Sequence, residues 1–357
     1  MNNFCNLIYL ILFLTLNFSC AKKKSPQKEI SKFEIVNTSK TDTLKFIYGI
    51  RSIFQDSEGN YWLGGYREGV ALFDGISFEY FTAYEGLSGN TILSIQEDRN
   101  GIIWFGTGNG GVSSYNDGII TIHDQITDDY SQSEWKNEDN NLWFSAGMSS
   151  GVYRNDSLLL NYLSFPVPTT ADLNNYGVTD ISIGQDGKVW IAASAALFSF
   201  DGKTLNVFDR NKLALQAGEL LHIRSVFADS QGRIWVGNNG IGVLLIQENS
   251  TINFSDKNGL IHTNSGGNRN GGVTSPAGTL EHVFAIEEDS EGNIWFGDRD
   301  TGPWKYDGKT MTNYTIDNKL LTPMILSIYN DNNNNLLFGM ADGGVYKFNG
   351  KSFEKYF

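Results

Sequence analysis

The chain has 357 residues, with 27 Lys and Arg against 40 Asp and Glu, so its formal net charge is 27 − 40 = −13. Such a chain lacks the basic face that displaces counterions from phosphates, which argues against a nucleic-acid partner. Apolar residues make up 40% and aromatic residues 13% of the chain. This is enough to bury a large core and excludes a disordered protein.

The N-terminus predicts an export signal. Residues 1–20 carry no charged side chain, and residues 7–16 form an apolar run that is too short to span a bilayer. Such a run is typical of the hydrophobic region of a signal peptide. The Ser19-Cys20 pair that follows resembles a bacterial lipoprotein signal, which implies cleavage of residues 1–19 and a lipid on the thiol of Cys20. A plain signal peptide or a buried N-terminal strand is the alternative.

Residues 20–44 predict a lipidated cysteine and a polar tether, since the stretch is rich in Lys, Ser, Thr and Asp. By the sorting rule of the same lipoproteins, Ala21 implies the outer membrane of a bacterial cell envelope. No cysteine follows Cys20. We therefore expect no intermolecular disulfide through the folded part and no thiolate site there for metal or catalysis.

The rest of the chain is built from a repeated motif with a period near 45 residues, in which an Asp-x-x-Gly turn precedes a Trp. Clear copies are DSEGNYWLGG at 56–65, DRNGIIWFGT at 98–107 and DSEGNIWFGD at 289–298. The seventh copy has Leu in place of Trp. The aligned positions are Trp62, Trp104, Trp143, Trp190, Trp235, Trp295 and Leu337.

Each repeat predicts four short strands. An alternating segment precedes the Asp-x-x-Gly turn, the Trp strand follows it, and a Gly-rich bend leads to a third strand. Asp-Gly or Asn-Gly pairs then predict two-residue hairpin turns into a fourth strand, because both positions of such a turn need positive φ. The pairs are Asp74-Gly75, Asp117-Gly118, Asp201-Gly202, Asp307-Gly308 and Asn349-Gly350.

We therefore expect an all-β fold over residues 45–357, a seven-bladed β-propeller with four antiparallel strands per blade. The aligned Trp side chains should be buried in one layer between neighbouring blades. The last blade should take all four strands from residues 325–356. The Asp-x-x-Gly turns lack the ligand spacing of a calcium loop and should be structural.

The repeat unit, clearest at residues 95–115, resembles the two-component regulator propeller repeat. In that family such repeats form periplasmic sensors of hybrid histidine kinases. The resemblance implies a sensor-like module, although no kinase segment follows the repeats here, so we expect no kinase activity. The blades also resemble streptogramin lyase, a seven-bladed propeller enzyme that uses His, Glu and Mg²⁺.

Propeller topology places the short Asp/Gly turns on one face and the variable inter-blade loops on the other, where binding sites usually lie. On this second face, the rim, the candidate ligand-binding residues are Tyr66, Arg67, Glu68, Asn109, His222, Arg224, Asn238, Asn239, His282, Asp298, Arg299, Asp300 and Trp304. Residues 262–279 are expected either to cover the channel mouth as a lid or to form a surface insertion.

Two candidates are ambiguous. His222 and His282 occupy equivalent positions on adjacent blades, and with Glu281 or Glu288 they could bind a metal or act as acid and base, or they could simply belong to a polar rim. Trp304 lies outside the repeated Trp position. It is expected either to stack on a sugar ring beside Arg299 or to pack under a loop.

Two functions follow from these features. The first is a lipid-anchored binding module for a glycan, a peptide or an envelope protein, favoured because no catalytic motif is present. We expect no cofactor for it. The alternative is a lyase or hydrolase that acts on a glycan or small molecule at the channel mouth. Convergence of both histidines with Glu281 or Glu288 would favour the enzyme, and separated, solvated side chains would favour binding.

Overall fold

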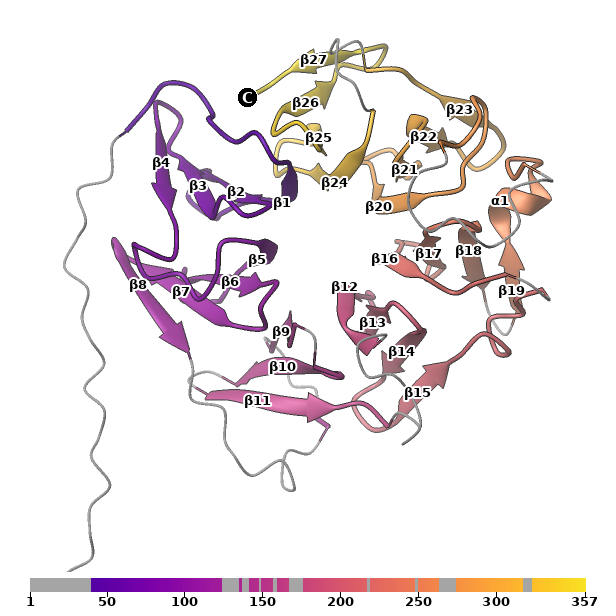
Figure 1. The fold of residues 1–357 in the computed structure, drawn as a ribbon, viewed down its shortest axis with the longest axis horizontal. Coiled ribbons are helices and arrows are strands. Elements are labelled where there is room, and N and C mark those ends of the chain that lie inside the picture. The colour runs from indigo at the N-terminus through magenta and orange to yellow at the C-terminus, as the bar shows by residue number, and fades with distance from the viewer. Residues whose placement is uncertain are drawn as a thin grey trace, which may run out of the picture. The chain divides into compact units, whose positions relative to one another are not determined.

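The computed structural model describes residues 40–123, 135–136, 141–147, 149–156, 159–166, 176–216, 219–247, 250–262, 274–316 and 323–357. Within these ranges the chain forms seven antiparallel sheets in a ring, with the strands of each sheet in sequence order from the centre outward (Figure 1). The all-β, seven-bladed propeller is thus confirmed. The predicted signal peptide and most of the tether lie outside the described residues.

The strands of the first four blades follow the predicted spacing. Blade 1 contains β1 (Ile50–Gln55), β2 (Tyr61–Gly65), β3 (Val70–Phe73) and β4 (Phe78–Phe81), and blade 2 contains β5 (Ile92–Glu97), β6 (Ile103–Thr107), β7 (Val112–Asn116) and β8 (Ile119–His123). In blade 3 the described strands are β9 (Leu142–Ser145), β10 (Gly151–Asp156) and β11 (Leu159–Ser164), and blade 4 contains β12 (Val178–Ile183), β13 (Val189–Ala193), β14 (Ala196–Phe200) and β15 (Leu205–Phe208).

The remaining blades repeat this order, with one short helix after blade 5. Blade 5 contains β16 (Ile223–Ala228), β17 (Ile234–Asn238), β18 (Gly242–Gln247) and β19 (Ser250–Asn253), followed by α1 (Phe254–Lys257). Blade 6 contains β20 (Val283–Glu288), β21 (Ile294–Asp298), β22 (Gly302–Tyr306) and β23 (Met311–Asn313), and blade 7 contains β24 (Ile325–Asn330), β25 (Leu336–Met340), β26 (Val345–Phe348) and β27 (Phe353–Lys355). No helix in the described ranges has the length and apolar character needed to cross a bilayer.

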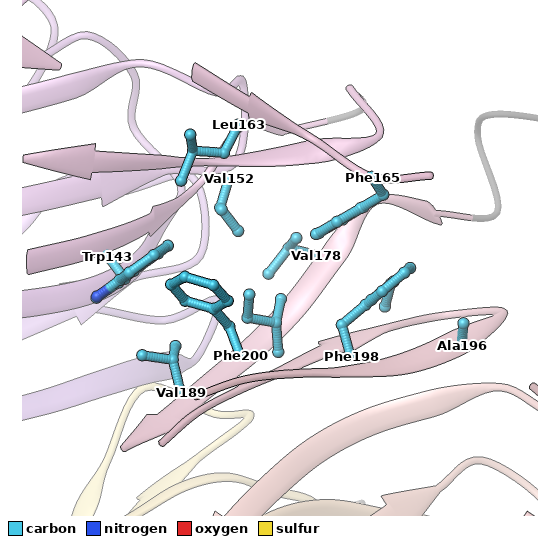
Figure 2. Packing of buried hydrophobic residues seen from close by; sticks show 11 residues of the cluster. Trp143, Val152, Leu163, Phe165, Val178, Val189, Ala196, Phe198 and Phe200 are labelled. Atoms are coloured by element: carbon cyan, nitrogen blue, oxygen red, sulfur yellow. The ribbon is translucent and has the colours of Figure 1, made fainter. Parts of the chain in front are cut away.

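The motif Trp residues pack between blades, as expected. Trp143, 1% exposed, contacts Val152 and Leu163 of its own blade and Phe200 of the next, and Figure 2 shows this cluster. Trp235, Trp295 and Leu337 are 0% exposed at the equivalent positions. Apolar burial of this kind contributes about 1.5–3 kcal/mol per large side chain, so the Trp layer is a main source of stability.

The Asp of the motif has a second role that the sequence did not reveal. Asp98 Oδ1 accepts the backbone N–H groups of Asn100 and Ile102, at 2.8 and 3.1 Å, as expected for the turn. Its Oδ2 also accepts the indole N–H of Trp104 at 3.1 Å. The same Asp–indole bond occurs in blades 1, 5 and 6. The turn and the core Trp are therefore linked by one carboxylate.

The glycine two residues after the motif Trp allows the blades to approach closely. A Cβ at Gly237 would lie 2.8 Å from the carbonyl oxygen of Val283 in the next blade, and a Cβ at Gly339 would lie 2.8 Å from that of Ile50. Such distances are too short for any side chain. The Trp-x-Gly pattern is therefore explained by contact between the inner layers of adjacent sheets.

One expectation about the outer hairpins was wrong for most blades. Only Asp117-Gly118 forms a two-residue turn with both φ values positive, 48° and 82°. At the other four pairs the loop has four residues. In blade 1, for example, Asp74 Oδ1 accepts the N–H groups of Ile76 and Ser77, and Phe73 pairs with Phe78. The side-chain bonds from Asp make the longer loop favourable.

Among the described residues, blade 7 takes its four strands from 325–355, as expected, and the ring closes between blades 7 and 1. Because blade 7 has Leu337 in place of Trp, Asp331 Oδ2 accepts the hydroxyl of Tyr61 from blade 1, at 2.6 Å. Ser327 Oγ donates to the carbonyl of Ile50 at 2.9 Å. At the outer edge, Thr41 pairs with Phe78, so the segment before blade 1 covers part of β4.

Candidate functional site

The predicted rim residues lie at one end of the sheets. In blade after blade, the backbone N–H just after the Trp strand donates to the carbonyl just before the innermost strand. Tyr66 N–H bonds to Gly49, Asn239 N–H to His222 and Arg299 N–H to His282, each at 2.9 Å. These bonds hold the bends after the Trp strands against the inter-blade loops, on the face opposite the Asp-x-x-Gly turns.

A β-bulge that recurs in the innermost strands directs side chains into the central channel. The innermost strand of each described pair has a β-bulge at its second residue, as in β1 at Arg51 and β16 at Arg224. Bulges turn a side chain away from the normal alternation. The bulged residues all line one cavity; they are Arg51, Leu93, Thr179, Arg224, Phe284 and Leu326.

This channel cavity has a volume of about 450 Å³ and runs along the innermost strands. Two of its bulged residues are arginines, Arg51 and Arg224. Within the described part of the chain, neither guanidinium has a carboxylate within 4.0 Å or a hydrogen-bond partner, and Arg224 Nε is fully buried. Burial lowers the pKa of both groups, and for Arg224 the charges of Arg51 and Arg299 lower it further.

The two arginines are positioned by aromatic rings. The guanidinium of Arg224 lies 5.0 Å from the ring centre of Phe284, and Tyr66 lies between Arg51 at 5.9 Å and Arg67 at 5.0 Å. Cation–π contacts of this kind orient a guanidinium without neutralising it. Arg67 is exposed and has a φ of 70°, a conformation that is uncommon outside glycine.

Carboxyl groups lie deeper in the channel. Burial raises the pKa of Asp180 to about 7 and that of Glu287 to about 8. Asp180 is directed at backbone groups, because its two oxygens accept the N–H groups of Ile181 and Val226 at 2.9 and 3.0 Å. The channel therefore has two arginines without an ion pair at the level of the bulges, and one of the nearby carboxyl groups, Asp180, acts on Arg51 through its charge.

The two histidines do not form the arrangement that we expected of an enzyme. Asn239 joins them, with its amide nitrogen 3.3 Å from His222 Nδ1 and its oxygen 2.7 Å from His282 Nδ1. His282 is 0% exposed. Burial, together with the charge of Arg224, lowers the pKa of His222 to about 4, so this ring is neutral at physiological pH.

The two glutamates are committed elsewhere. Glu281 accepts the hydroxyl of Ser275 at 2.7 Å and the N–H of His262 at 2.8 Å. Glu288 lies on the opposite, turn face, where it accepts both donors of Ser230 at 2.6–2.7 Å. Among the residues that the structure describes, no three His, Cys, Asp or Glu side chains gather closely enough to hold a metal ion.

Several rim candidates are used to hold the loops. Asp298 is completely buried and accepts four backbone N–H groups, among them those of His282 and Thr301, and burial raises its pKa to about 6. Glu68 accepts the N–H groups of Ile47 and Tyr48. Asn238 is also 0% exposed. Asp298 and Glu68 therefore support the loops of the rim, whereas neither amide atom of the buried Asn238 has a hydrogen-bond partner among the described residues.

Of the two alternatives for Trp304, the structure shows packing. Its side chain is 4% exposed, packs with Phe254 and Trp235, and donates its indole N–H to Thr301 Oγ1 at 2.9 Å. The alternative of packing under a loop therefore holds. Arg299, beside it, makes a bidentate contact with Asp300, at 2.9 and 2.8 Å.

The possible lid falls mostly outside the described residues, since 263–273 are not among them. The described end of this segment is fixed to the rim. Ser275 donates its hydroxyl to Glu281 and its N–H to Asp300, the latter at 2.9 Å.

The sequence-based analysis missed Arg51, Asp180 and Glu287, and also the exposed aromatic residues Tyr48 and Tyr84, which are 58% and 89% exposed in the loops before β1 and β5. A signal was available for the first three. Each is a charged residue inside an innermost strand, where the equivalent residues of other repeats are Leu93, Ser94 and Phe54.

Four segments match the family model of the two component regulator propeller: residues 47–67, 86–109, 220–240 and 279–300. They fall in the four blades that have the Asp–indole bond. In these four segments the chain is similar to the two component regulator propeller repeat. No curated protein sequence matches it.

Solved structures show the same fold at low sequence identity. One is the extracellular domain of BT3049 from B. thetaiotaomicron, described as a hybrid two component system, with 20% identity and a TM-score of 0.61; the match covers 87% of this chain but only 40% of that one. Virginiamycin B lyase from Staphylococcus aureus has 13% identity and a TM-score of 0.61, over 85% and 97% of the two chains. PorZ, a surface component of the type-IX secretion system of Porphyromonas gingivalis, has 18% identity and a TM-score of 0.56, over 84% and 46%.

Proposed function

We propose that this protein is a sensor-like binding module of a bacterial cell envelope, anchored by a lipid on Cys20 and a tether over residues 21–44. Its ligand is a glycan, a peptide or an envelope protein that docks on the rim and reaches into the channel. The extracellular and surface location of the BT3049 domain and PorZ supports the location, and the lipoprotein-like signal supports the anchor.

The observation that carries the binding site is the channel cavity of about 450 Å³ beneath the rim. Its volume is in the range of small-molecule sites, and residues from several blades converge on it. Arg51 and Arg224 line this cavity, and Arg67 is exposed at the rim, so positive charge lies at this end of a protein of net charge −13. The opposite face offers turns whose Asp side chains are occupied by backbone and indole N–H groups.

The lyase or hydrolase alternative has less support. The sign expected of an enzyme was a close approach of His222 and His282 to a glutamate. Both rings instead bond to Asn239. Neither glutamate bonds to these rings in the described contacts, since Glu281 holds Ser275 and Glu288 holds Ser230. The likeness to virginiamycin B lyase, at 13% identity, concerns the fold.

The test is a glycan and protein array with the soluble fragment of the mature chain, residues 21–357, followed by mapping of any binder. Arg67→Ala and Asn109→Ala change exposed rim residues, and Glu58→Ala is a matched control because it changes an exposed residue of a turn on the other face. We expect the rim variants to weaken binding and the control to leave it unchanged. Loss of binding in the Glu58 variant alone would place the site on the turn face and refute the proposal.

A further inference from the structure

The unpaired charge of the channel arginines identifies a ligand class. We propose that Arg51 and Arg224 together bind an oxyanion group, a carboxylate, sulfate or phosphate, of the ligand that enters the channel. This inference rests on the proposed function and deepens it, because it assigns the chemistry of one end of the ligand.

The first argument is the state of the two guanidiniums. A charged group that leaves water without a partner is strongly destabilising, and proteins normally pair it. In the described structure Arg51 and Arg224 are half-buried and have aromatic neighbours but no carboxylate at ion-pair distance, although the charge of Asp180 acts on Arg51. The charge of Arg51 is also close enough to lower the pKa of Arg224. An oxyanion between them would relieve both the desolvation and the repulsion.

The second argument is the place of these residues in the fold. Both occupy the bulge position, which the fold turns into the channel, in blades 1 and 5. The other described bulge residues, Leu93, Thr179, Phe284 and Leu326, are uncharged. No other described bulge residue therefore supplies a carboxylate, and the nearest acidic group with an electrostatic effect on Arg51 is Asp180. Asp180, one residue deeper, gives its two oxygens to backbone N–H groups of Ile181 and Val226.

The third argument concerns geometry and size. A guanidinium presents a planar set of donors that matches the oxygens of carboxylate, sulfate and phosphate. Phe284 and Tyr66 hold the two guanidinium planes against rings, which reduces the entropy lost on binding. The cavity of about 450 Å³ also accommodates more than a simple ion, so the oxyanion belongs to a small molecule or to a protruding group of a larger one.

The experiment is calorimetric titration of the mature chain with sodium D-glucuronate and with sodium sulfate, with D-glucose as the neutral control. Ionic strength is kept constant with chloride, because exposed charges respond to salt. The test variant is the double substitution Arg51→Met and Arg224→Met. The matched control is Arg99→Met, in a turn on the opposite face. A second variant, Arg51→Lys with Arg224→Lys, keeps the charges and removes the planar donors.

We expect saturable binding of at least one oxyanion probe, no binding of glucose, and at least tenfold weaker binding in the Met double variant, a change equivalent to about 1.4 kcal/mol. The Met double variant should keep or exceed the melting temperature of the parent, because it removes two half-buried cations that have no ion pair in the described structure. A melting temperature that falls by more than about 5 °C would show a structural role for these arginines and count against the proposal.

The proposal is overturned if neither oxyanion binds, or if the Met double variant binds it as the parent does. The latter result would mean an adventitious ion only, bound elsewhere on the surface. If an array ligand bound through Arg67 and Asn109 equally well to the parent and the Met double variant, the proposed function would stand and this inference would fail. If no array ligand bound the rim while the oxyanion bound the arginines, the proposed function would fail and the assignment of an oxyanion site to Arg51 and Arg224 would stand.

Discussion

The bond between the motif carboxylate and the motif indole can be measured by one matched pair of substitutions. Trp295 and Trp143 are equivalent, almost fully buried residues, 0% and 1% exposed. Trp295 Nε1 donates to Asp289 Oδ2 at 2.7 Å, whereas Trp143 Nε1 has no partner among the described residues. Replacing each with Phe removes a similar part of the ring, but only Trp295→Phe also removes a hydrogen bond.

The difference between the two variants therefore contains the bond to Asp289, together with the relief of the unpaired buried N–H of Trp143, which acts in the same direction. A hydrogen bond to a charged acceptor contributes about 1.5–3 kcal/mol. Because Asn293 Nδ2 still donates to Asp289 Oδ2 at 2.9 Å, the acceptor is not left unpaired, and the value should lie near 1.5 kcal/mol. The assay is urea unfolding followed by circular dichroism, with equal m-values required of both variants. Losses that agree within about 0.5 kcal/mol would refute the role assigned to the motif Asp.

Four further outcomes are expected. Trp104→Ala should lower the free energy of unfolding by about 3–5 kcal/mol, and a loss below about 1 kcal/mol in urea titration would contradict the packed Trp layer. Burial raises the pKa values of Asp180 and Glu287 to about 7 and about 8, so folding takes up protons. The free energy of unfolding should therefore fall as pH rises from about 4 toward these values. The double variant Asp180→Asn, Glu287→Gln should show a smaller decline in melting temperature between pH 5 and 8, and an unchanged decline would disprove this role. Replacement of residues 263–273 by a short linker should alter ligand affinity without lowering the melting temperature, and the reverse pattern would show that this segment supports the fold. Cys20→Ala should abolish detergent partitioning and globomycin-sensitive processing, and a variant that still partitions with membranes would rule out the lipid anchor.

The fold could be predicted because its determinants are local and repeated. Each Asp-x-x-Gly turn and each Trp strand recurs at nearly the same spacing, so the number of blades and their strand order follow from alignment of the copies. The outer hairpins were harder, since Asp74-Gly75 and Asp117-Gly118 look alike in sequence. Only the side-chain bonds of Asp74 to the next residues reveal the longer loop.

The site was predicted only in part, for a physical reason. Topology alone places Arg67, Asn109 and His222 at the rim, but a bulge decides which residue of an innermost strand faces the channel. A bulge interrupts the alternation of inward and outward side chains along a strand. The direction of Arg51 therefore does not follow from the sequence pattern, and this residue was missed. The burial of His282 depends on contacts between blades 5 and 6, which no local pattern records.

The end of the 262–279 insertion also depends on tertiary contacts that the sequence pattern does not show. The sequence shows a polar, Gly-rich stretch that is expected to form a lid or a surface insertion, and it does not mark where the insertion ends. In the structure, Ser275 bonds to Glu281 and Asp300, so the removable part ends before residue 274. The boundary between a loop and its support is set by these tertiary bonds.

The most direct test of the account is a crystal structure of the mature chain soaked in selenate, an oxyanion whose selenium scatters anomalously. The account predicts an anomalous peak in the channel, within hydrogen-bond distance of both Arg51 and Arg224, that is absent from crystals of the Arg51→Met, Arg224→Met variant. Selenate found only on the outer surface, with the channel arginines unoccupied at a concentration that saturates the solution titration, would contradict it.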